Sequence, residues 1–301
     1  MELWIPVTLA AAFLQNVRSA MQKHLKNVMG TTGATFVRFG FGVPFAILFV
    51  VLLDAGAGYP LPAANLDFAL WCVVGGVSQI AATFLLIHLF SFRNFAVGTA
   101  YSRTEPAQAA LFGLLFLGES VSAGVVAAIA ISVFGVMLIS VAHVAFTWRT
   151  LVTSVFGRNA LIGLASGTAF GISAVAYRAA SLSLGGPNAL MQAATTLAVV
   201  IVFQTVLMWA WMFWRDRSEI GRILRAWKPS LVVGMVGASA SFGWFFAMTL
   251  QQAAVVKSLA QVEMLFTFLS TVFLFKERIN WKEVAGCALI VCGILTLLAF
   301  R

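Results

Sequence analysis

Charged residues are scarce in this 301-residue chain, at 10% of the sequence, whereas hydrophobic residues make up 61%. An average soluble domain is about half apolar and about a quarter charged. Because a globule must present much polar surface to water, this composition excludes a soluble enzyme and a disordered regulator. It predicts a protein that lies within a lipid bilayer.

The sequence also has few chemically reactive groups. Its three cysteines, Cys72, Cys287 and Cys292, lie in apolar runs without a CxxC pair, which argues against a disulfide framework or a zinc site. It contains no nucleophile elbow, phosphate-binding loop or HExxH motif, so we expect no enzymatic activity and no cofactor. The net charge is +9, but the basic residues avoid the long apolar runs, so it predicts membrane topology and not nucleic-acid binding.

Long apolar segments are abundant. A helix needs about 20 apolar residues to cross the hydrocarbon core, and lipid provides no partners for an open backbone. The sequence therefore predicts an all-α membrane protein. Ten spans are expected, at residues 4–22, 32–53, 68–90, 95–116, 121–145, 159–183, 188–214, 229–252, 255–275 and 281–300. Met1-Glu2-Leu3-Trp4 carries an acid and no base, so we expect the first span to be retained and not cleaved as a signal peptide.

The loop charges predict an orientation, because cytoplasmic loops collect Lys and Arg. Of the 19 basic residues, 13 lie on the side opposite the termini. We therefore expect loops 23–31, 146–158, 215–228 and 276–282 to be cytoplasmic and both termini to lie outside. The basic residues on the cytoplasmic side are Lys23, Lys26, Arg93, Arg149, Arg158, Arg215, Arg217, Arg222, Arg225, Lys228, Lys276, Arg278 and Lys282.

The two halves of the chain resemble each other. Residues 105–119 begin and end with a glutamate around an apolar run, and so do residues 263–277. The same offset of 158 also relates Gly76 to Gly234 and Gly135 to Gly293. This predicts two domains, residues 1–150 and 151–301. With five spans each, the second copy would enter the membrane from the opposite side, as in transporters that rock around a central site.

The motif that starts with Glu105-Pro106, continues with an apolar run and ends with Gly118-Glu119 before a Gly-containing helix resembles the EamA-like module of the drug/metabolite transporter superfamily. The resemblance covers nearly the whole chain and occurs twice. It implies a ten-helix bundle that moves small organic solutes, with a cavity lined by the first, third and fourth helices of each repeat. Met264 replaces Pro106 in the second copy, so we expect only the first copy to be broken there. The predicted orientation also differs from the inside termini usual for relatives.

Four ionisable residues are expected deep in the membrane, where a charge is costly and marks a functional hypothesis. Glu105 would lie about 15 Å into its span, at 1.5 Å per residue, and Glu263 at a similar level from the other face. Arg103 and Glu105 are two residues apart and would not face each other, so Arg38 is the candidate neighbour of Glu105. Residues nearer the predicted helix ends are interpreted as anchors or boundary residues, namely Arg18, Lys23, His24, Arg93, Glu119, Arg178 and Glu277.

Two interpretations of the deep charges remain open. Glu105 and Glu263 could bind a substrate amine or a proton, and Arg103 and Arg38 could bind an acidic group. Alternatively, the four pair with each other and hold helices together. Other polar or aromatic residues on the cavity helices that could orient a solute are Asn16, Gln79, Tyr101, Ser102, Trp244 and Gln261.

We therefore expect a secondary transporter of the bacterial inner membrane that exports a small polar or amphipathic metabolite by alternating access, coupled to protons or to exchange. Its partners would be a small-molecule substrate and the lipid bilayer, with protons as a further candidate, and it would act as a monomer or homodimer. A flippase of lipid or lipid-linked headgroups and a non-transporting structural or sensory subunit are the alternatives.

Overall fold

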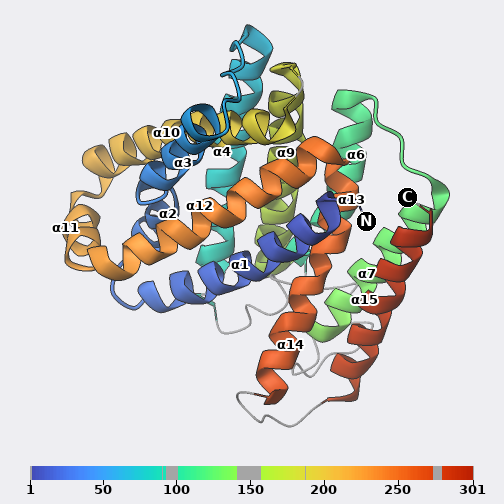
Figure 1. Ribbon diagram of the computed structural model, residues 1–301. Coiled ribbons are helices and arrows are strands. Elements are labelled where there is room, and N and C mark those ends of the chain that lie inside the picture. The colour runs from blue at the N-terminus through green and yellow to red at the C-terminus, as the bar shows by residue number, and fades with distance from the viewer. Residues whose placement is uncertain are drawn as a thin grey trace.

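The computed structural model describes residues 2–89, 91–92, 101–140, 157–186, 188–273 and 280–300, without the side chains of 267 and 270–273. All regular elements in these ranges are helices (Figure 1). Seven of the helical segments are long and apolar enough to cross a membrane. This agrees with the expected all-helical membrane fold.

The first half begins with the 22-residue helix α1. Its described elements are α1 (Trp4–Leu25), α2 (Thr31–Gly40), α3 (Val43–Val51), the π-helical turn η1 (Leu52–Gly56), α4 (Leu66–Leu89), α6 (Glu105–Leu117) and α7 (Ala123–Ser140). Gly118 ends α6 with a φ of 65°, a left-handed conformation that glycine adopts without a steric penalty.

The second half contains one helix that the sequence analysis placed in a loop. Its elements are α9 (Arg158–Ser183), α10 (Ala189–Arg215), α11 (Arg217–Arg225), α12 (Trp227–Leu250), α13 (Ala253–Leu259), the 3-10 turn η2 (Ala260–Val262), α14 (Glu263–Phe273) and α15 (Trp281–Phe300). The prediction that residues 215–228 form a loop is wrong, because α11 covers most of this range. Ile223 and the Glu219 carboxylate are buried against the protein, which gives this polar helix a packed face.

Helices are interrupted at corresponding places in both halves. Glu105 begins α6 after a turn at residues 103–104, and Glu263 begins α14 after the 3-10 turn η2. The expectation that only the copy with Pro106 is broken is therefore wrong. In the second copy, side chains contact the irregular backbone: Asn16 donates to the Glu263 carbonyl at 3.4 Å. A break of this kind is tolerated at membrane depth where neighbouring polar groups satisfy the backbone.

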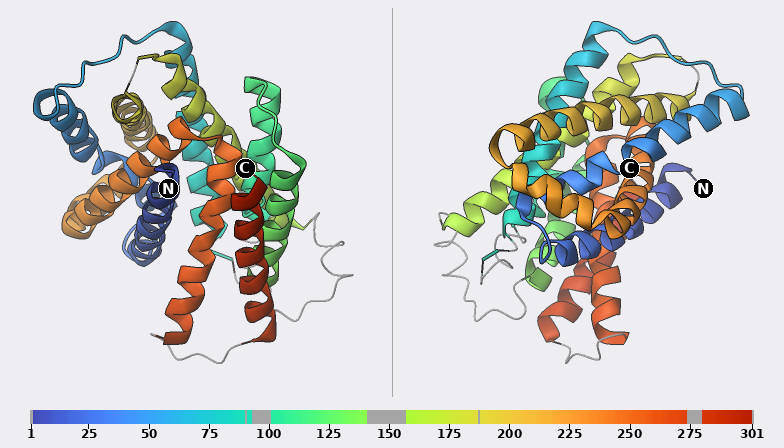
Figure 2. Two further views of the ribbon diagram at one scale, coloured as in Figure 1. Left: turned by 45° about the vertical axis from the view of Figure 1, so that its right-hand side comes forward. Right: turned by 90° about the vertical axis from the view of Figure 1, so that its left-hand side faces the viewer.

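The helices pack in pairs that join the two halves. α1 packs along α12, α4 along α9, and α7 along α15, and the last pair lies side by side in both views of Figure 2. Glycine permits the close approach of α7 and α15, since a Cβ on Gly135 would lie 2.7 Å from the Gly286 carbonyl oxygen. Glycine also permits a close approach to α9, because a Cβ on Gly167 would lie 2.9 Å from the Ser102 carbonyl oxygen.

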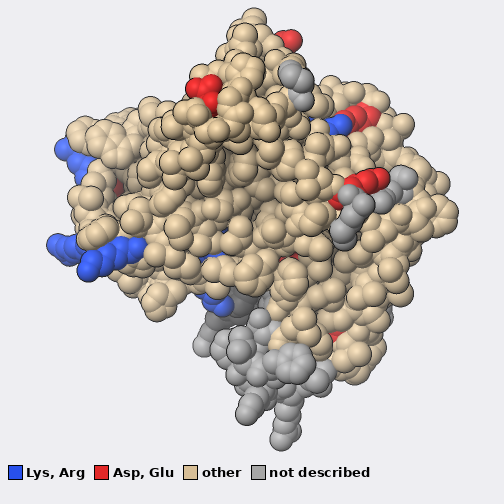
Figure 3. Space-filling view, viewed as in Figure 1, with Lys and Arg blue, Asp and Glu red and all other residues tan. Residues whose placement is uncertain are grey.

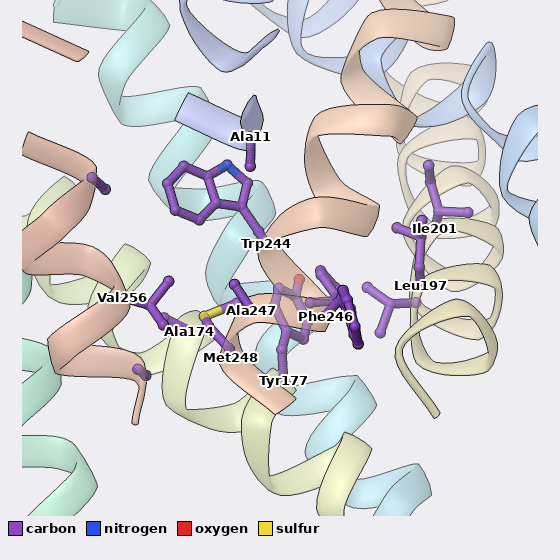
Figure 4. Packing of buried hydrophobic residues seen from close by; sticks show 14 of the residues in the cluster. Ala11, Ala174, Tyr177, Leu197, Ile201, Trp244, Phe246, Ala247, Met248 and Val256 are labelled. Carbon is purple, nitrogen blue, oxygen red and sulfur yellow. The ribbon is translucent and has the colours of Figure 1, made fainter. Parts of the chain in front are cut away.

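Aromatic and aliphatic side chains from α1, α9, α10, α12 and α13 pack together in the buried core (Figure 4). The rings of Tyr177 and Phe245 stack with their centroids 4.3 Å apart. Trp244, Phe246 and Met248 are also buried. These side chains form the apolar wall beside which the polar cavity described below lies.

Much of the surface of the described residues is apolar, as lipid contact requires, and large exposed side chains include Leu115, Val206 and Trp214. In the face shown in Figure 3, most Lys and Arg side chains gather at the end where α10, α11 and α12 meet.

Lys26 follows α1, and its ammonium donates to the Ile87 carbonyl at 3.0 Å. Partial burial lowers the pKa of Lys26 because the charged form loses hydration.

Gly234 is expected to be intolerant of substitution. A Cβ at this position of α12 would lie 2.3 Å from the backbone carbonyl carbon of Phe41, where no side-chain rotation can relieve the clash. Gly234→Ala should therefore cost about 1 to 3 kcal/mol through overpacking, measured as a lower unfolding temperature in detergent. Gly221→Ala on α11 is the matched control, since a Cβ there meets nothing within 4 Å. Equal unfolding temperatures for the two variants would contradict the packing described for α12.

Candidate solute-binding cavity

A partly open cavity of about 280 Å³ lies between the two halves of the chain. Its lining comes from α1, α4, residues 102–105, α9, α12, α13 and α14, with Arg38 added from α2. These are the first, third and fourth helices of each half, which agrees with what the EamA resemblance implied. The volume is close to the lower end of the range of about 300–1,000 Å³ typical of small-molecule sites.

Glu263 connects three elements at one end of the cavity. Its carboxylate forms an ion pair with the Arg103 guanidinium and accepts a hydrogen bond from the Gln15 amide at 3.1 Å. The Arg103 side chain is 29% exposed, so the pair borders accessible space.

Glu105 occupies the corresponding position at the start of α6. It forms an ion pair with Lys257 of α13, with 2.9 Å between Oε1 and Nζ. The Lys257 ammonium also lies over the Trp244 ring, 4.6 Å from its centroid, in a cation–π contact. Each glutamate of one half is therefore paired with a cation of the other half, and both pairs lie beside a helix break.

Trp244 and Gln15 link these two ion pairs. The Trp244 indole N–H donates to the Gln15 side-chain oxygen at 3.0 Å, while the amide of Gln15 reaches Glu263. An unbroken series of contacts thus runs from Lys257 through Trp244 and Gln15 to Glu263. Such connected networks hold charged groups in defined positions, which a binding site requires.

Arg38 lies elsewhere in the cavity than the sequence analysis expected. Its guanidinium donates to the Thr83 hydroxyl at 3.2 Å and to the Ser241 hydroxyl at 3.5 Å. None of the ion pairs among the described residues joins Arg38 to Glu105, so the predicted neighbour relation is wrong. The carboxylate of Glu105 instead pairs with Lys257 of α13, in the other half of the chain.

Gln79 lines the cavity as part of a buried polar cluster. It accepts hydrogen bonds from the Tyr177 hydroxyl at 3.0 Å and from the Gln204 amide at 2.9 Å. Gln204 also donates to the Gly76 carbonyl at 3.1 Å. The cluster joins α4, α9 and α10, and it fixes the orientation of Gln79 at the cavity wall.

Six of the eight candidate site residues line the cavity, and two do not. Glu105, Glu263, Arg103, Arg38, Trp244 and Gln79 are lining residues. Tyr101 is buried outside the lining. Gln261 also lies outside it, and its amide donates to the Arg103 carbonyl at 3.2 Å. Of the boundary residues, Arg93 and Glu277 lie outside the described residues.

Lys257 lies at the cavity although the sequence pattern gave no indication of it, and Arg18 and Arg178 are not the interfacial anchors that their positions near helix ends predicted. Arg18 is only 4% exposed and lines the cavity, so the anchor interpretation is wrong for this residue. Arg178 is also largely buried; it pairs with Glu119 at 2.6 Å and donates to the carbonyls of Met248 at 2.6 Å and Gln251 at 2.9 Å. In the sequence, both arginines lie near a predicted helix end, where a long basic side chain can extend to the interface. That position gave no signal that either side chain is buried.

Comparisons with known proteins agree with this architecture. The sequence matches the EamA-like transporter family twice, over residues 2–141 and 158–299. A solved crystal structure of a protein matches with a TM-score of 0.73 at 17% identity, covering 99% of this chain and 97% of the other, which shows a shared fold. No curated protein matches the sequence. Because the family matches span nearly the whole chain, this protein belongs to the EamA-like transporter family.

Proposed function

We propose that this protein is a secondary transporter that moves a small polar or amphipathic metabolite across the membrane by alternating access. The observation that carries the proposal is the polar cavity between the two halves, where charged side chains from both halves meet. A structural or sensory subunit would have no need for accessible ionisable groups at the centre of a bundle, where each is costly to maintain.

The packing supports two repeats of opposite orientation within a ten-span bundle. The offset of 158 residues relates α1 to α9 and α4 to α12, and the observed pairs α1–α12 and α4–α9 are exchanged by this relation. The pair α7–α15 is its own counterpart. Reciprocal packing of this kind is expected when two copies are related by a two-fold axis in the membrane plane.

One end of the cavity is open and the other is covered. Lys23 lines the cavity and is exposed, so the cavity reaches the surface near the loop that follows α1. On the opposite side, Arg178 connects Glu119 with the end of α12. We propose that Arg178 and Glu119 form the closed gate of this state, and that the gate opens when the two halves rock.

The loop charges support an orientation in which the open end faces the cytoplasm. α11 and its flanks carry Arg215, Arg217, Arg222, Arg225 and Lys228, on the side that the positive-inside rule assigns to the cytoplasm. With this orientation both termini lie outside, and the open cavity would load solute from the cytoplasm of a bacterial cell for export.

Counterflow in proteoliposomes tests the proposal. Vesicles preloaded with one unlabelled solute at a time are diluted into the same labelled solute, over a panel of amino acids, organic acids, phosphate esters and polyamines, with and without an imposed pH gradient. We expect protein-dependent accumulation of at least one solute class, and none in protein-free vesicles. The absence of protein-dependent flux for every class and under every gradient would contradict the proposed function.

A further inference from the structure

Two arginines in the cavity lack an acidic partner among the described residues. Arg18 is 4% exposed and Arg38 is 3% exposed, and neither takes part in an ion pair there. Arg18 Nε and Nη1 and Arg38 Nε are buried without a hydrogen-bond acceptor. Buried charges are normally paired, because losing hydration without compensation is costly. The described chain thus gives neither guanidinium an acidic partner, and both groups line the cavity from which an acceptor could reach them.

The side chains of Arg18 and Arg38 lie close together, against the same residue of α12. Gly237 of α12 lies against both stems, since a Cβ at this position would be 3.2 Å from Arg18 Cδ and 3.5 Å from Arg38 Cγ. The cations are also close enough to repel each other. Their remaining polar contacts are with the neutral hydroxyls of Ser19, Thr83 and Ser241, which do not cancel the charge.

The remaining charges of the cavity favour an anion over a cation as the missing partner. Both lining carboxylates are already occupied, Glu105 by Lys257 and Glu263 by Arg103. A cationic solute would have to displace one of these partners, whereas an anionic group meets two buried guanidinium groups without an acidic partner. Guanidinium groups bind carboxylates and phosphates through planar, charge-assisted hydrogen bonds.

We propose that Arg18 and Arg38 form the subsite for an anionic group, a carboxylate or a phosphate, of the transported solute. This inference rests on the proposed function, because it assigns the solute's charge at the same cavity. The occupied state would compensate two buried positive charges, and the empty state leaves them in mutual repulsion. The subsite thus predicts that occupancy stabilises the protein.

Thermal unfolding in detergent tests the subsite without requiring transport. The probes are sodium phosphate, sodium succinate and putrescine dihydrochloride, each compared with sodium chloride at equal ionic strength. We expect phosphate or succinate to raise the unfolding temperature saturably and putrescine to leave it unchanged. No response of the wild-type protein to either anion would overturn the assignment.

The variants Arg18→Gln and Arg38→Gln should each weaken the apparent affinity for the anion about tenfold or more. Without ligand, they should melt at or above the wild-type temperature, because one of two repelling buried charges is gone. Arg38→Lys, which keeps the charge but loses the planar fork, should bind with intermediate affinity. Arg225→Gln on α11 is the matched control, since that residue is exposed and lies outside the cavity lining. An unchanged anion response in all three cavity variants would overturn the subsite.

The phosphate of a lipid headgroup could occupy the subsite in the same way as a soluble phosphate. A second experiment, in nanodiscs of defined lipid composition, distinguishes these two ligands. In nanodiscs of phosphatidylcholine, the wild-type protein should still respond to phosphate or succinate. If phosphatidylglycerol alone raises the unfolding temperature of the wild type but not of Arg38→Gln, and removes the response to soluble anions, the solute assignment is overturned. Anion binding without flux would contradict the proposed function and leave the subsite intact.

Discussion

Glu263→Gln is expected to destabilise the protein by about 1 to 3 kcal/mol and to reduce transport by about tenfold or more, since about 1.4 kcal/mol corresponds to a factor of ten in rate. The substitution leaves the Arg103 guanidinium without its carboxylate and weakens the acceptor that holds Gln15. The cost is below the roughly 3–5 kcal/mol of a fully buried broken pair, because the Arg103 side chain is 29% exposed and water screens it. Thermal unfolding in detergent and counterflow measure the two effects.

The double variant Arg103→Gln, Glu263→Gln distinguishes a pair from two independent residues. It should regain most of the lost stability, because neither unpaired charge remains, yet transport should stay low if the pair positions the helix break. Asp67→Asn, an exposed carboxylate at the start of α4, is the control for removal of one negative charge. Strictly additive losses from the two single substitutions would contradict the ion pair.

Arg178→Met is expected to be the most damaging change outside the cavity. It removes the ion pair with Glu119 and the two charge-assisted hydrogen bonds to the carbonyls of Met248 and Gln251 at the end of α12. Each hydrogen bond to a charged group contributes about 1.5–3 kcal/mol. The unfolding temperature should therefore fall by several degrees, and the closed gate should open more often.

Labelling of a cysteine behind the gate reports this opening. Thr249→Cys places a thiol at a buried position beside Arg178, and an impermeant thiol reagent should react with it slowly in the parent protein. In the Arg178→Met background we expect the reaction to be about tenfold faster, since 1.4 kcal/mol changes an opening equilibrium by that factor. Arg225→Met, at an exposed position of α11, is the control. Equal labelling rates in all three proteins would show that Arg178 does not close this end.

The membrane fold and the placement of the two glutamates at one cavity could be predicted from the sequence, because they rest on composition and on a repeated pattern. Glu105 and Glu263 lie at matching positions of the two copies, and both line the cavity. The helix breaks beside these two glutamates could not be predicted in the same way. A hydropathy pattern does not show that a span stops and restarts, so the depth assigned to Glu105 assumed a continuous helix that the structure does not have.

The partners of the charges were harder to predict for a physical reason. Distance along the chain to a helix end is a poor measure of burial when helices tilt and extend. α1 continues to Leu25, which places Arg18 well inside a packed helix and not at the interface. Likewise, the orientation of α13 about its own axis decides whether Lys257 faces lipid or Glu105. The hydropathy pattern of a single helix does not show which residue of the other repeat it will contact.

Chemical blocking of the cavity tests the central claim, that solute passes between the two halves. Ser19→Cys introduces a near-isosteric thiol at the cavity wall beside Arg18, in a background with Cys72, Cys287 and Cys292 replaced by alanine. Ser218→Cys, the same change at an exposed position of α11, is the control. After reaction with a bulky methanethiosulfonate reagent, we predict that counterflow of the transported solute falls to background only in Ser19→Cys, and that excess solute slows the reaction. Full transport through a quantitatively modified Ser19→Cys protein would contradict the account.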